Sequence, residues 1–402
     1  MDGVFSRKER KDHKAGGPTS VSATIDRSGW KRVRLGEVCT IKARIGWQGL
    51  KKSEYLDSGN YCLVSGTDFR NGFVNWNTCS FVSKWRYNQD TNIQLKNGDV
   101  LITKDGTIGK VAYVHGMACP TTLNSGIFVI RPTATKLHPA FLQLIFKSRF
   151  FTDFLDRITA GSTIVHLYQK DIVDFDLPIP NDNTQLKIVD AIQSIDKSID
   201  NQEAVIAKYE AIKKATVNLL LEPKAGWKRM KLDEICMCLD NYREPVNEVE
   251  RASMHGDIPY CGANGIVDYV NDFTIDDSII LIAEDGGYFD QYESRPIAYR
   301  MSGKAWINNH AHILKAKRDY CQDFIFYSLE HKDITPFITS GTRAKLTKGE
   351  LSNIEIDTPP SFQEQRKIAE KIIAIDNALA DYKAQLEKAR KLKAGMMSYF
   401  FG

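Results

Sequence analysis

The sequence lacks long apolar runs, and this absence excludes a membrane-spanning helix. No segment of the 402 residues approaches the roughly 20 apolar residues that crossing a bilayer requires. Residues 1–14 are charged and lack the apolar core of a secretory signal, so we expect a cytoplasmic protein without membrane contact. The 43% hydrophobic and 26% charged residues are typical of globular proteins, and the length predicts about two to four domains.

Closely spaced cysteines and a strong net charge are also lacking. Of eight cysteines, only Cys236 and Cys238 are near each other in sequence, and no second pair or spaced histidine pair accompanies them. This pattern predicts no structural zinc site and is typical of free thiols that are buried as small hydrophobic side chains. The net charge of +4 is too small to indicate a nucleic-acid-binding protein by itself.

The chain contains an internal repeat. Residues 29–39 (GWKRVRLGEVC) return as residues 226–236 (GWKRMKLDEIC). Three further pairs of similar segments follow in the same order, and from residue 105 onward their separation stays near 180 residues. These pairs are 97–106 with 276–286, 160–163 with 340–343, and 176–180 with 355–359. We interpret the chain as a tandem duplication with two diverged middle parts.

Each half closes with a segment whose heptad spacing predicts a long helix. The apolar residues alternate at intervals of four and three, with Gln202 as a polar interruption in the first copy. They are Ile188, Ile192, Ile195, Ile199 and Ile206 in the first copy and Ile368, Ile372, Ile375, Leu379 and Leu386 in the second. Either each helix packs on its own globular half, or the two pair as an antiparallel coiled coil. The strict heptad spacing favours pairing, which would make a spacer rod of about 50 Å.

These patterns predict a mixed α+β fold with a pseudo-two-fold tandem repeat. We expect two globular domains, at residues 29–183 and 222–362. Helical spacer regions follow them at residues 184–221 and 363–402, and residues 1–28 form a polar leader.

Several segments resemble the specificity (S) subunits of type I restriction–modification systems. They are Gly29-Trp30 and Gly226-Trp227, the strand and loop from Gly98 to Gly109, the segment from Trp306 to His312, and the Gln-x-x-Ile helix openings at Gln185 and Gln365. The resemblance covers residues 29–402, with both halves in the family's order. It implies two target-recognition domains that read the two halves of an asymmetric, interrupted DNA sequence, and paired helices that set the gap.

The resemblance also implies partners and cofactors. Double-stranded DNA and two methyltransferase subunits are the expected partners, and two restriction subunits join in complexes that cleave DNA. S-adenosylmethionine, and ATP with Mg²⁺ for restriction, would belong to those partners, so no cofactor is expected in this chain. The leader, residues 1–28, is either a disordered tail or, as the family allows, an arm packed against the helical region.

Catalytic motifs are missing. The chain has neither the Asn-Pro-Pro-aromatic motif nor the glycine-rich cofactor loop of adenine methyltransferases. The segment from Gly106 to Lys110 is too short for a P-loop, so it predicts a tight turn whose amides could contact a phosphate. His310 and His312 alternate along a predicted strand, but no third metal ligand is suggested. We therefore predict a non-catalytic reader of DNA.

The two halves carry opposite charge. Residues 29–180 contain 19 Lys and Arg against 12 Asp and Glu, whereas residues 222–360 contain 16 against 23. The first domain thus has the electrostatic character of a phosphate-binding protein. The second would need a local basic or polar face, and protein contact is the alternative for it. For the whole chain, the alternative function is a bilobed protein-interaction scaffold that does not bind DNA.

Candidate DNA contacts are amide, hydroxyl, aromatic and cationic side chains on loops that follow strands. In the first half, the candidate base readers are Arg44, Gln48, Lys104, Thr107 and Asn124, and the candidate phosphate contacts are Lys51 and Lys52. In the second half, the candidate base readers are Arg243, Asn264, Tyr288, Asn309 and His310. Paired loops before the last strand of each half suit backbone contact through Ser162, Thr163 and His166, and through Thr342, Arg343 and Lys345.

Overall fold

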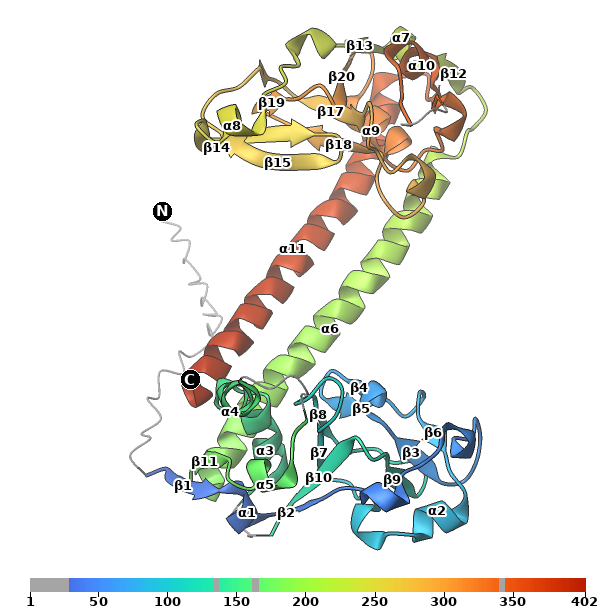
Figure 1. Ribbon diagram of the computed structural model, residues 1–402. Helices are drawn as coiled ribbons and strands as arrows, with labels where there is room; N and C mark the ends of the chain where they lie inside the picture. The colour runs from blue at the N-terminus through green and yellow to red at the C-terminus, as the bar shows by residue number, and fades with distance from the viewer. Residues whose placement is uncertain (1–28, 134–136, 161–165, 340–343) are drawn as a thin grey trace, which may run out of the picture. The chain divides into compact units, whose positions relative to one another are not determined.

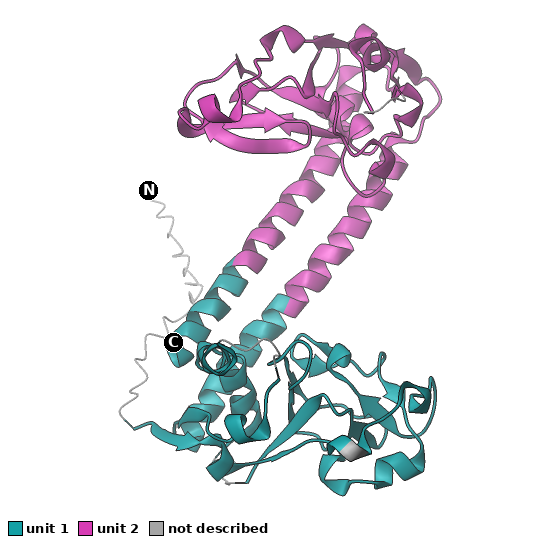
Figure 2. Cartoon of the chain, in the orientation of Figure 1, with its two compact units in different colours: residues 1–199, 388–402 teal, residues 200–387 magenta. Residues whose placement is uncertain are grey.

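The computed structural model describes residues 29–133, 137–160, 166–339 and 344–402. The chain divides into two compact units, residues 1–199 with 388–402 and residues 200–387 (Figure 2). Two long helices, α6 (Asp182–Leu221) and α11 (Phe362–Phe401), each contribute to both units (Figure 1). None of the described helices is long and apolar enough to cross a membrane.

The first unit is built around a sheet with the strand order β2-β10-β7-β8-β5-β4. These strands are β2 (Cys39–Lys42), β10 (Ile127–Pro132), β7 (Val100–Thr103), β8 (Val111–Tyr113), β5 (Phe73–Val74) and β4 (Phe69–Arg70). A second sheet has the order β6 (Ser80–Phe81), β3 (Cys62–Val64) and β9 (Thr121–Leu123), and β1 (Lys31–Arg34) pairs with β11 (Asp176–Ile179). The helices are α1 (Leu35–Val38), α2 (Lys84–Asn88), α3 (Pro139–Phe146), α4 (Arg149–Thr159) and α5 (Gln169–Ile172).

The central strand β7 is continuously apolar because both of its faces are buried. Val100 and Ile102 pack with the aromatic residues of α3 and α4, whereas Leu101 packs with Val64 and Leu123 of the second sheet. The strand thus alternates between two hydrophobic clusters, one under the helices and one between the sheets.

The second unit repeats this plan. Its first sheet has the order β13 (Cys236–Cys238), β20 (Ala311–Ala316), β17 (Ile279–Ala283) and β18 (Ala298–Met301). Its second sheet has the order β15 (Gly265–Val270), β14 (His255–Gly262), β19 (Lys304–Ile307) and β16 (Ile275–Asp276), and β12 (Lys228–Lys231) pairs with β21 (Glu355–Thr358). The helices are α7 (Leu232–Ile235), α8 (Glu248–Arg251), α9 (Gln322–Glu330) and α10 (Lys348–Asn353). Ile280 and Ile282 pack under α9, and Leu281 packs toward the second sheet.

The tryptophan of each repeated Gly-Trp segment makes an equivalent contact with the core of its unit. The ring of Trp30 lies edge-on to Phe141 of α3 at 6.3 Å, and the ring of Trp227 lies edge-on to Phe324 of α9 at 6.0 Å. Both tryptophans are partly buried against the core of their unit, so they anchor the repeat.

The repeated glutamines at the starts of α6 and α11 are buried hydrogen-bonding links. The side chain of Gln365 accepts a hydrogen bond from the amide of Cys321 (2.8 Å) and donates one to the carbonyl of Pro359 (3.2 Å). In the first unit, Gln185 accepts from the amide of His138 (2.8 Å) and donates to the carbonyl of Pro180 (3.0 Å). Each glutamine therefore ties the start of a long helix to the preceding strand end and to the start of a globular helix.

Both packing alternatives for the heptad residues occur along the helices. Near their starts, Ile188 and Ile192 belong to the core of the first unit, and Ile368 and Ile372 to the core of the second. Further along, Ile206, Leu379 and Leu386 are buried, while Ile195, Ile199 and Ile375 are half-buried.

The two helices run antiparallel where they contact each other. Within the second unit, Glu210 pairs with Lys383 (2.8 Å) and Lys213 with Asp376 (2.9 Å), so residue numbers rise on α6 as they fall on α11. Within the first unit, Lys393 pairs with Asp196 (2.5 Å). Lys393–Asp196 and Lys213–Asp376 are the same pair one repeat apart, which extends the duplication to the helices.

One expectation about the cysteines is wrong. We predicted that all eight are free thiols, but the structure joins Cys62 and Cys119 in a disulfide. The pairing of β3 with β9 brings the two together, because Cys62 lies opposite Thr121, two residues beyond Cys119. A separation of 57 residues in sequence concealed this proximity. The other six cysteines are free, and five of them are buried.

Candidate nucleic-acid interface

Each unit places a polar loop at the end of its central strand, and equivalent backbone hydrogen bonds hold the two loops. In the first unit, the amide of Leu167 donates to the carbonyl of Lys104, the residue after β7 (2.9 Å). In the second, the amide of Leu346 donates to the carbonyl of Glu284, the residue after β17 (2.7 Å). The two loops thus have the same backbone hydrogen bond, but the residue that provides the carbonyl is basic in one unit (Lys104) and acidic in the other (Glu284).

In the second unit, this loop gathers most of the candidate DNA contacts. Glu284 forms ion pairs with Arg243 and with Lys345 (2.7 Å), and Asp285 lies 2.8 Å from Nδ1 of His310. The side chains of His310 and Lys345 remain 42% and 47% exposed, whereas that of Arg243 is 19% exposed. The acids therefore hold two exposed, nitrogen-bearing side chains at fixed places on the surface.

The remaining second-unit candidates flank the same loop. Asn264 is exposed, and its side-chain amide donates to the carbonyl of Gly286 (2.9 Å). Asn309 is exposed, and its carbonyl accepts from Arg243 (3.4 Å). Tyr288 lies within the loop, with the guanidinium of Arg295 4.2 Å from the centre of its ring. Four of the five base-reading candidates of the second half therefore lie around residues 284–286, and Tyr288 follows two residues later.

Two acids of this cluster stay ionised because of their neighbours. Burial by itself would raise the pKa of Glu284, but hydrogen bonds from Lys345 and Arg243 hold that pKa below its ordinary value of 4.5. Asp240 is similar: burial opposes its charge, but the contact with His312 and the hydrogen bond from the amide of Ile313 keep its pKa below 3.8. Their negative charge offsets the positive charge of the side chains beside them. These acids are part of the excess of acidic over basic residues in the second half.

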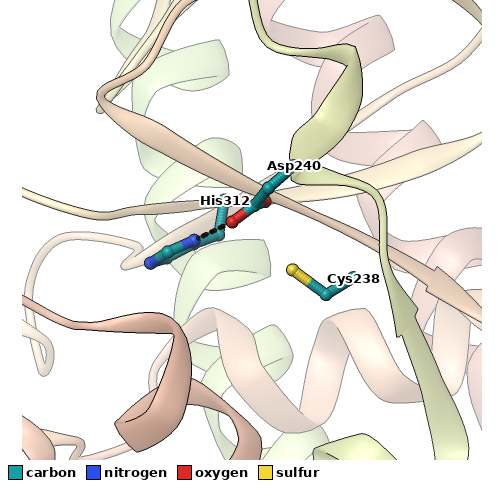
Figure 3. Close-up of side chains that lie close together, drawn as sticks. All are labelled: Cys238, Asp240 and His312. Carbon is teal, nitrogen blue, oxygen red and sulfur yellow. Dashed lines mark hydrogen bonds and ion pairs between the residues drawn. The ribbon is translucent and has the colours of Figure 1, made fainter.

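Beneath the loop lies a buried polar group that no candidate site included. His312 is 1% exposed, and its Nδ1 lies 2.7 Å from Asp240 while its Nε2 donates to the carbonyl of Leu346 (2.8 Å). Cys238 is the third member (Figure 3), and burial raises the pKa of its thiol to about 11. The sequence offered His312 no further ligand, but the structure places two possible ligands beside it.

In the first unit, Lys104 and His166 converge on Asp105. His166 contacts Asp105 directly, and the ammonium group of Lys104 lies 3.6 Å from the same carboxylate. The Lys104 ammonium also lies 5.7 Å from the ring centre of Phe128, and its side chain is only 15% exposed. Lys104 is thus partly covered, and His166, at 25%, is somewhat more open.

Asn124 and Thr107 lie near this group in different settings. The amide of Asn124 donates to the hydroxyl of Tyr55 (2.7 Å), and its oxygen accepts from the amide of Gly126 (3.0 Å). Thr107 is exposed in the turn after β7. The amides of Gly109 and Lys110 donate to Thr103 at 2.9 and 3.0 Å, so these two are engaged within the turn and not directed at a phosphate.

Arg44 and Gln48 are buried, at 2% and 6% exposure. The guanidinium of Arg44 donates to the carbonyl of Leu123 (2.8 Å) and to Thr122 (3.1 Å), which supports the segment before Asn124. In this position neither side chain presents a surface to a base edge. Lys51 and Lys52 are exposed, as a phosphate contact requires.

Four candidates lie outside the described residues: Ser162 and Thr163 in the first half, and Thr342 and Arg343 in the second. The leader, residues 1–28, lies outside them too.

The acids that organise the loops were absent from the candidate set. Asp105 and Asp285 are equivalent, because each follows the central strand by two residues and contacts a histidine. Their signal in the sequence is the acidic-glycine turn that both repeats share, Asp105-Gly106 and Asp285-Gly286. The side chain of Asp285 is only 14% exposed, whereas that of Asp105 is 45% exposed.

Comparison with known proteins places both halves in one family. The sequence profile described as the type I restriction modification DNA specificity domain matches residues 27–211 and again 224–389. A type I restriction enzyme specificity subunit of Haemophilus influenzae is 39% identical over 142 residues, which is 35% of each chain. The MjaVIII specificity subunit of Methanocaldococcus jannaschii is 25% identical over 208 residues, 50% of this chain and 47% of that one. The alignments thus span less than half the length of these curated relatives.

The fold is shared with a solved structure. The S subunit of a type I restriction–modification system from M. genitalium aligns with 93% of this chain and 96% of its own, with a TM-score of 0.65 and 17% identity. At that identity, the similarity concerns the fold, which is mixed α and β with long helices.

Proposed function

Because the chain belongs to the family of type I restriction–modification DNA specificity domains, we propose that it is the DNA-recognition subunit of such a system. Each globular part would read one half of an asymmetric, bipartite double-stranded DNA target. The match of the family profile to both halves supports this proposal and disfavours a scaffold that does not bind DNA.

One observation carries the proposal of two different half-sites. Lys104 and Glu284 occupy the same place in equivalent backbone frames, but one is basic and the other is acidic and paired with Arg243 and Lys345. A lysine suits a guanine edge or a phosphate, whereas a carboxylate suits the amino group of cytosine. Two domains with the same backbone arrangement but different side chains would recognise two different DNA half-sites. Two identical domains would instead recognise a palindrome.

The acidic second unit would contact DNA through a local face. Among the described residues, His310 and Lys345 offer exposed nitrogen donors beside the Glu284–Asp285 turn, and Asn264 and Asn309 add exposed amides. Amides are well suited to base edges, especially adenine. We therefore propose that this unit contributes more to sequence preference than to salt-dependent affinity.

Chemistry would be supplied by partners. We propose that two methyltransferase subunits dock on the helices α6 and α11, and that restriction subunits join them in complexes that cleave. S-adenosylmethionine, and ATP with Mg²⁺ for restriction, would bind to those subunits, which flip the target adenine out of the duplex. The chain itself would be non-catalytic and would reside in the cytoplasm, on chromosomal DNA.

The proposal is tested by sequencing methylated bases. The chain is expressed with its methyltransferase subunits in a host that lacks other methylation, and the modified adenines should define two half-sites with a fixed gap. Replacing residues 29–180 by the corresponding domain of another specificity subunit should change one half-site and leave the other unchanged. A change in both half-sites, or methylation without a common sequence, would contradict the proposal.

A second test measures the binding of two variants to a DNA duplex that contains both half-sites. Lys51→Ala with Lys52→Ala should weaken binding to all sequences alike and reduce the slope of log affinity against log salt by about 1 to 2. Asn264→Ala should reduce discrimination at one base pair by about 1–3 kcal/mol, with the salt slope unchanged.

A further inference from the structure

The strand register of the second unit places metal-ligating side chains together. Cys238 lies opposite Leu314 in the antiparallel pair β13–β20. Asp240 begins the turn Asp240–Tyr242 that follows β13, and His312 lies two residues before Leu314 on β20. Their sulfur, oxygen and nitrogen atoms lie within 4.8 Å of one another (Figure 3).

Hydrogen bonds orient the histidine and the carboxylate as ligands. Nε2 of His312 faces the carbonyl of Leu346 at 2.8 Å, and because a carbonyl only accepts, Nε2 carries the hydrogen. This leaves Nδ1 as the nitrogen that can bind a metal, in the arrangement common among metal-bound histidines. Asp240 receives the amide of Ile313 on Oδ1 (3.0 Å) and directs Oδ2 toward His312 (2.7 Å).

A positive centre beside Nδ1 would stabilise the contact between His312 and Asp240. A neutral imidazole that donates through Nε2 has a lone pair at Nδ1, and that lone pair would oppose the lone pairs of the carboxylate. Either a proton or a metal ion removes this repulsion. Arg243 supplies part of the positive charge, because it lies 3.3 Å from Asp240, and it also pairs with Glu284. A bound cation would take the Asp240 oxygen and leave Arg243 with Glu284.

The first unit has no such group at the equivalent positions. His312 lies opposite Ile282 of β17, and Phe128 lies opposite Ile102 of β7, so these two residues correspond. By the same registers, Ile41 and Ala43 correspond to Cys238 and Asp240. Burial of polar side chains where the sister unit packs apolar ones costs free energy unless they are compensated. All three positions are apolar in the first unit and can ligate a metal in the second. This joint difference indicates a function besides packing.

We propose that Cys238, Asp240 and His312 bind a zinc-class divalent cation within the second unit. Thiolate, imidazole and carboxylate are the three ligand types that zinc uses, and sets of three protein ligands leave one coordination position open. The site lies directly beneath the Glu284 loop, because Leu346 joins His312 and Glu284 through its carbonyl and amide. A bound ion would thereby help to fix Glu284 and Asp285, which contact Lys345 and His310.

The test uses the full-length chain with Co²⁺ or Zn²⁺ alone, without DNA or partner subunits. After desalting, the protein should retain one Zn²⁺ per chain by elemental analysis, and Co²⁺ should give a thiolate charge-transfer band in the near ultraviolet. Cys238→Ala should lose both the ion and the band. Cys236→Ala is the matched control, because Cys236 is a buried free thiol of the same strand outside the group, and it should retain both.

Two further measurements keep the test independent of a folding failure. The triple variant Cys238→Ile, Asp240→Ala and His312→Phe copies the apolar residues of the first unit and should remain folded by circular dichroism but bind no ion. In the unmodified chain, Zn²⁺ should slow alkylation of Cys238 and leave that of Cys236 unchanged, as read by mass spectrometry. A Co²⁺ spectrum that survives Cys238→Ala, or alkylation of Cys238 that Zn²⁺ does not slow, would overturn the proposal.

Discussion

At the scale of single residues, repeated polar side chains and diverged ones have different roles. Gln185 and Gln365 are buried, and each binds the backbone amide before a globular helix and a proline carbonyl near the end of the preceding strand, so they hold the repeat together. Lys104 and Glu284 occupy equivalent places but differ in charge, and their side chains are 15% and 14% exposed. A polar residue that recurs in both halves is thus a structural element here, and one that differs is a candidate for specificity.

Gln365→Ala should destabilise the second unit by about 2–6 kcal/mol. The substitution leaves the amide of Cys321 and the carbonyl of Pro359 buried without their partner, at about 1–3 kcal/mol for each unsatisfied group. Urea unfolding of the full chain measures the change. Gln363→Ala, an exposed glutamine of the same helix, is the control and should change the unfolding free energy by less than about 0.5 kcal/mol.

Acid should weaken the second unit through Glu284. Because the folded-state pKa of Glu284 lies below its ordinary value of 4.5, the charged form stabilises the fold above that pH. This contribution is lost as the pH falls below 4.5 and through the folded-state pKa. The unfolding free energy, measured between pH 7 and pH 3, should fall less steeply for Glu284→Gln than for the unmodified chain. Parallel curves would show that the Arg243 and Lys345 contacts add no pH-dependent stability.

At the scale of elements, burial on both faces explains why the central strands are continuously apolar. Strands β7 and β17 each lie between a helical layer and a second sheet. The long helices instead combine two kinds of contact, with their starts in a globular core and later heptad positions at the contact between the helices. A heptad pattern alone does not separate these contacts, because both require an apolar stripe.

Removal of the Cys62–Cys119 disulfide should destabilise the first unit by about 4 kcal/mol. A cross-link over 57 residues restricts the unfolded chain, and the loop-entropy relation gives this magnitude. The unfolding free energy of the oxidised chain is compared with that of Cys62→Ser with Cys119→Ser. Addition of reductant should lower the stability of the unmodified chain and leave the double variant unchanged. Equal stability of the oxidised chain and the double variant would contradict the expectation.

At the scale of the whole molecule, the near-neutral charge conceals two opposite halves. The first globular part has an excess of basic residues, and the second an excess of acidic ones. In the second part, Glu284, Asp285 and Asp240 are used to hold basic and imidazole side chains. Part of the acidic excess therefore lies in internal ion pairs at the proposed interface.

Lengthening both helices by one heptad should widen the gap between the half-sites. Seven residues add about 10 Å at 1.5 Å per residue, which corresponds to about three base pairs at 3.4 Å each. Insertions in the paired parts of α6 and α11 keep the seam in register, and methylation sequencing reads the new gap. An insertion in α6 alone is the control and should abolish specific methylation. An unchanged gap between the half-sites, with methylation intact, would contradict the prediction that the helices act as a spacer.

The sequence by itself determined the duplication, the long helices and the family, because repeated order and heptad spacing are local patterns along the chain. It also indicated Arg243, Asn264, Tyr288, Asn309 and His310 as candidate DNA contacts; the structure places four of them around residues 284–286, and their contact with DNA stays a prediction. Only the tertiary structure decided that Arg44 and Gln48 are buried, that Cys62 meets Cys119, and that Cys238 and Asp240 lie beside His312. Those outcomes depend on strand register between distant segments, and composition and spacing carry no record of that register.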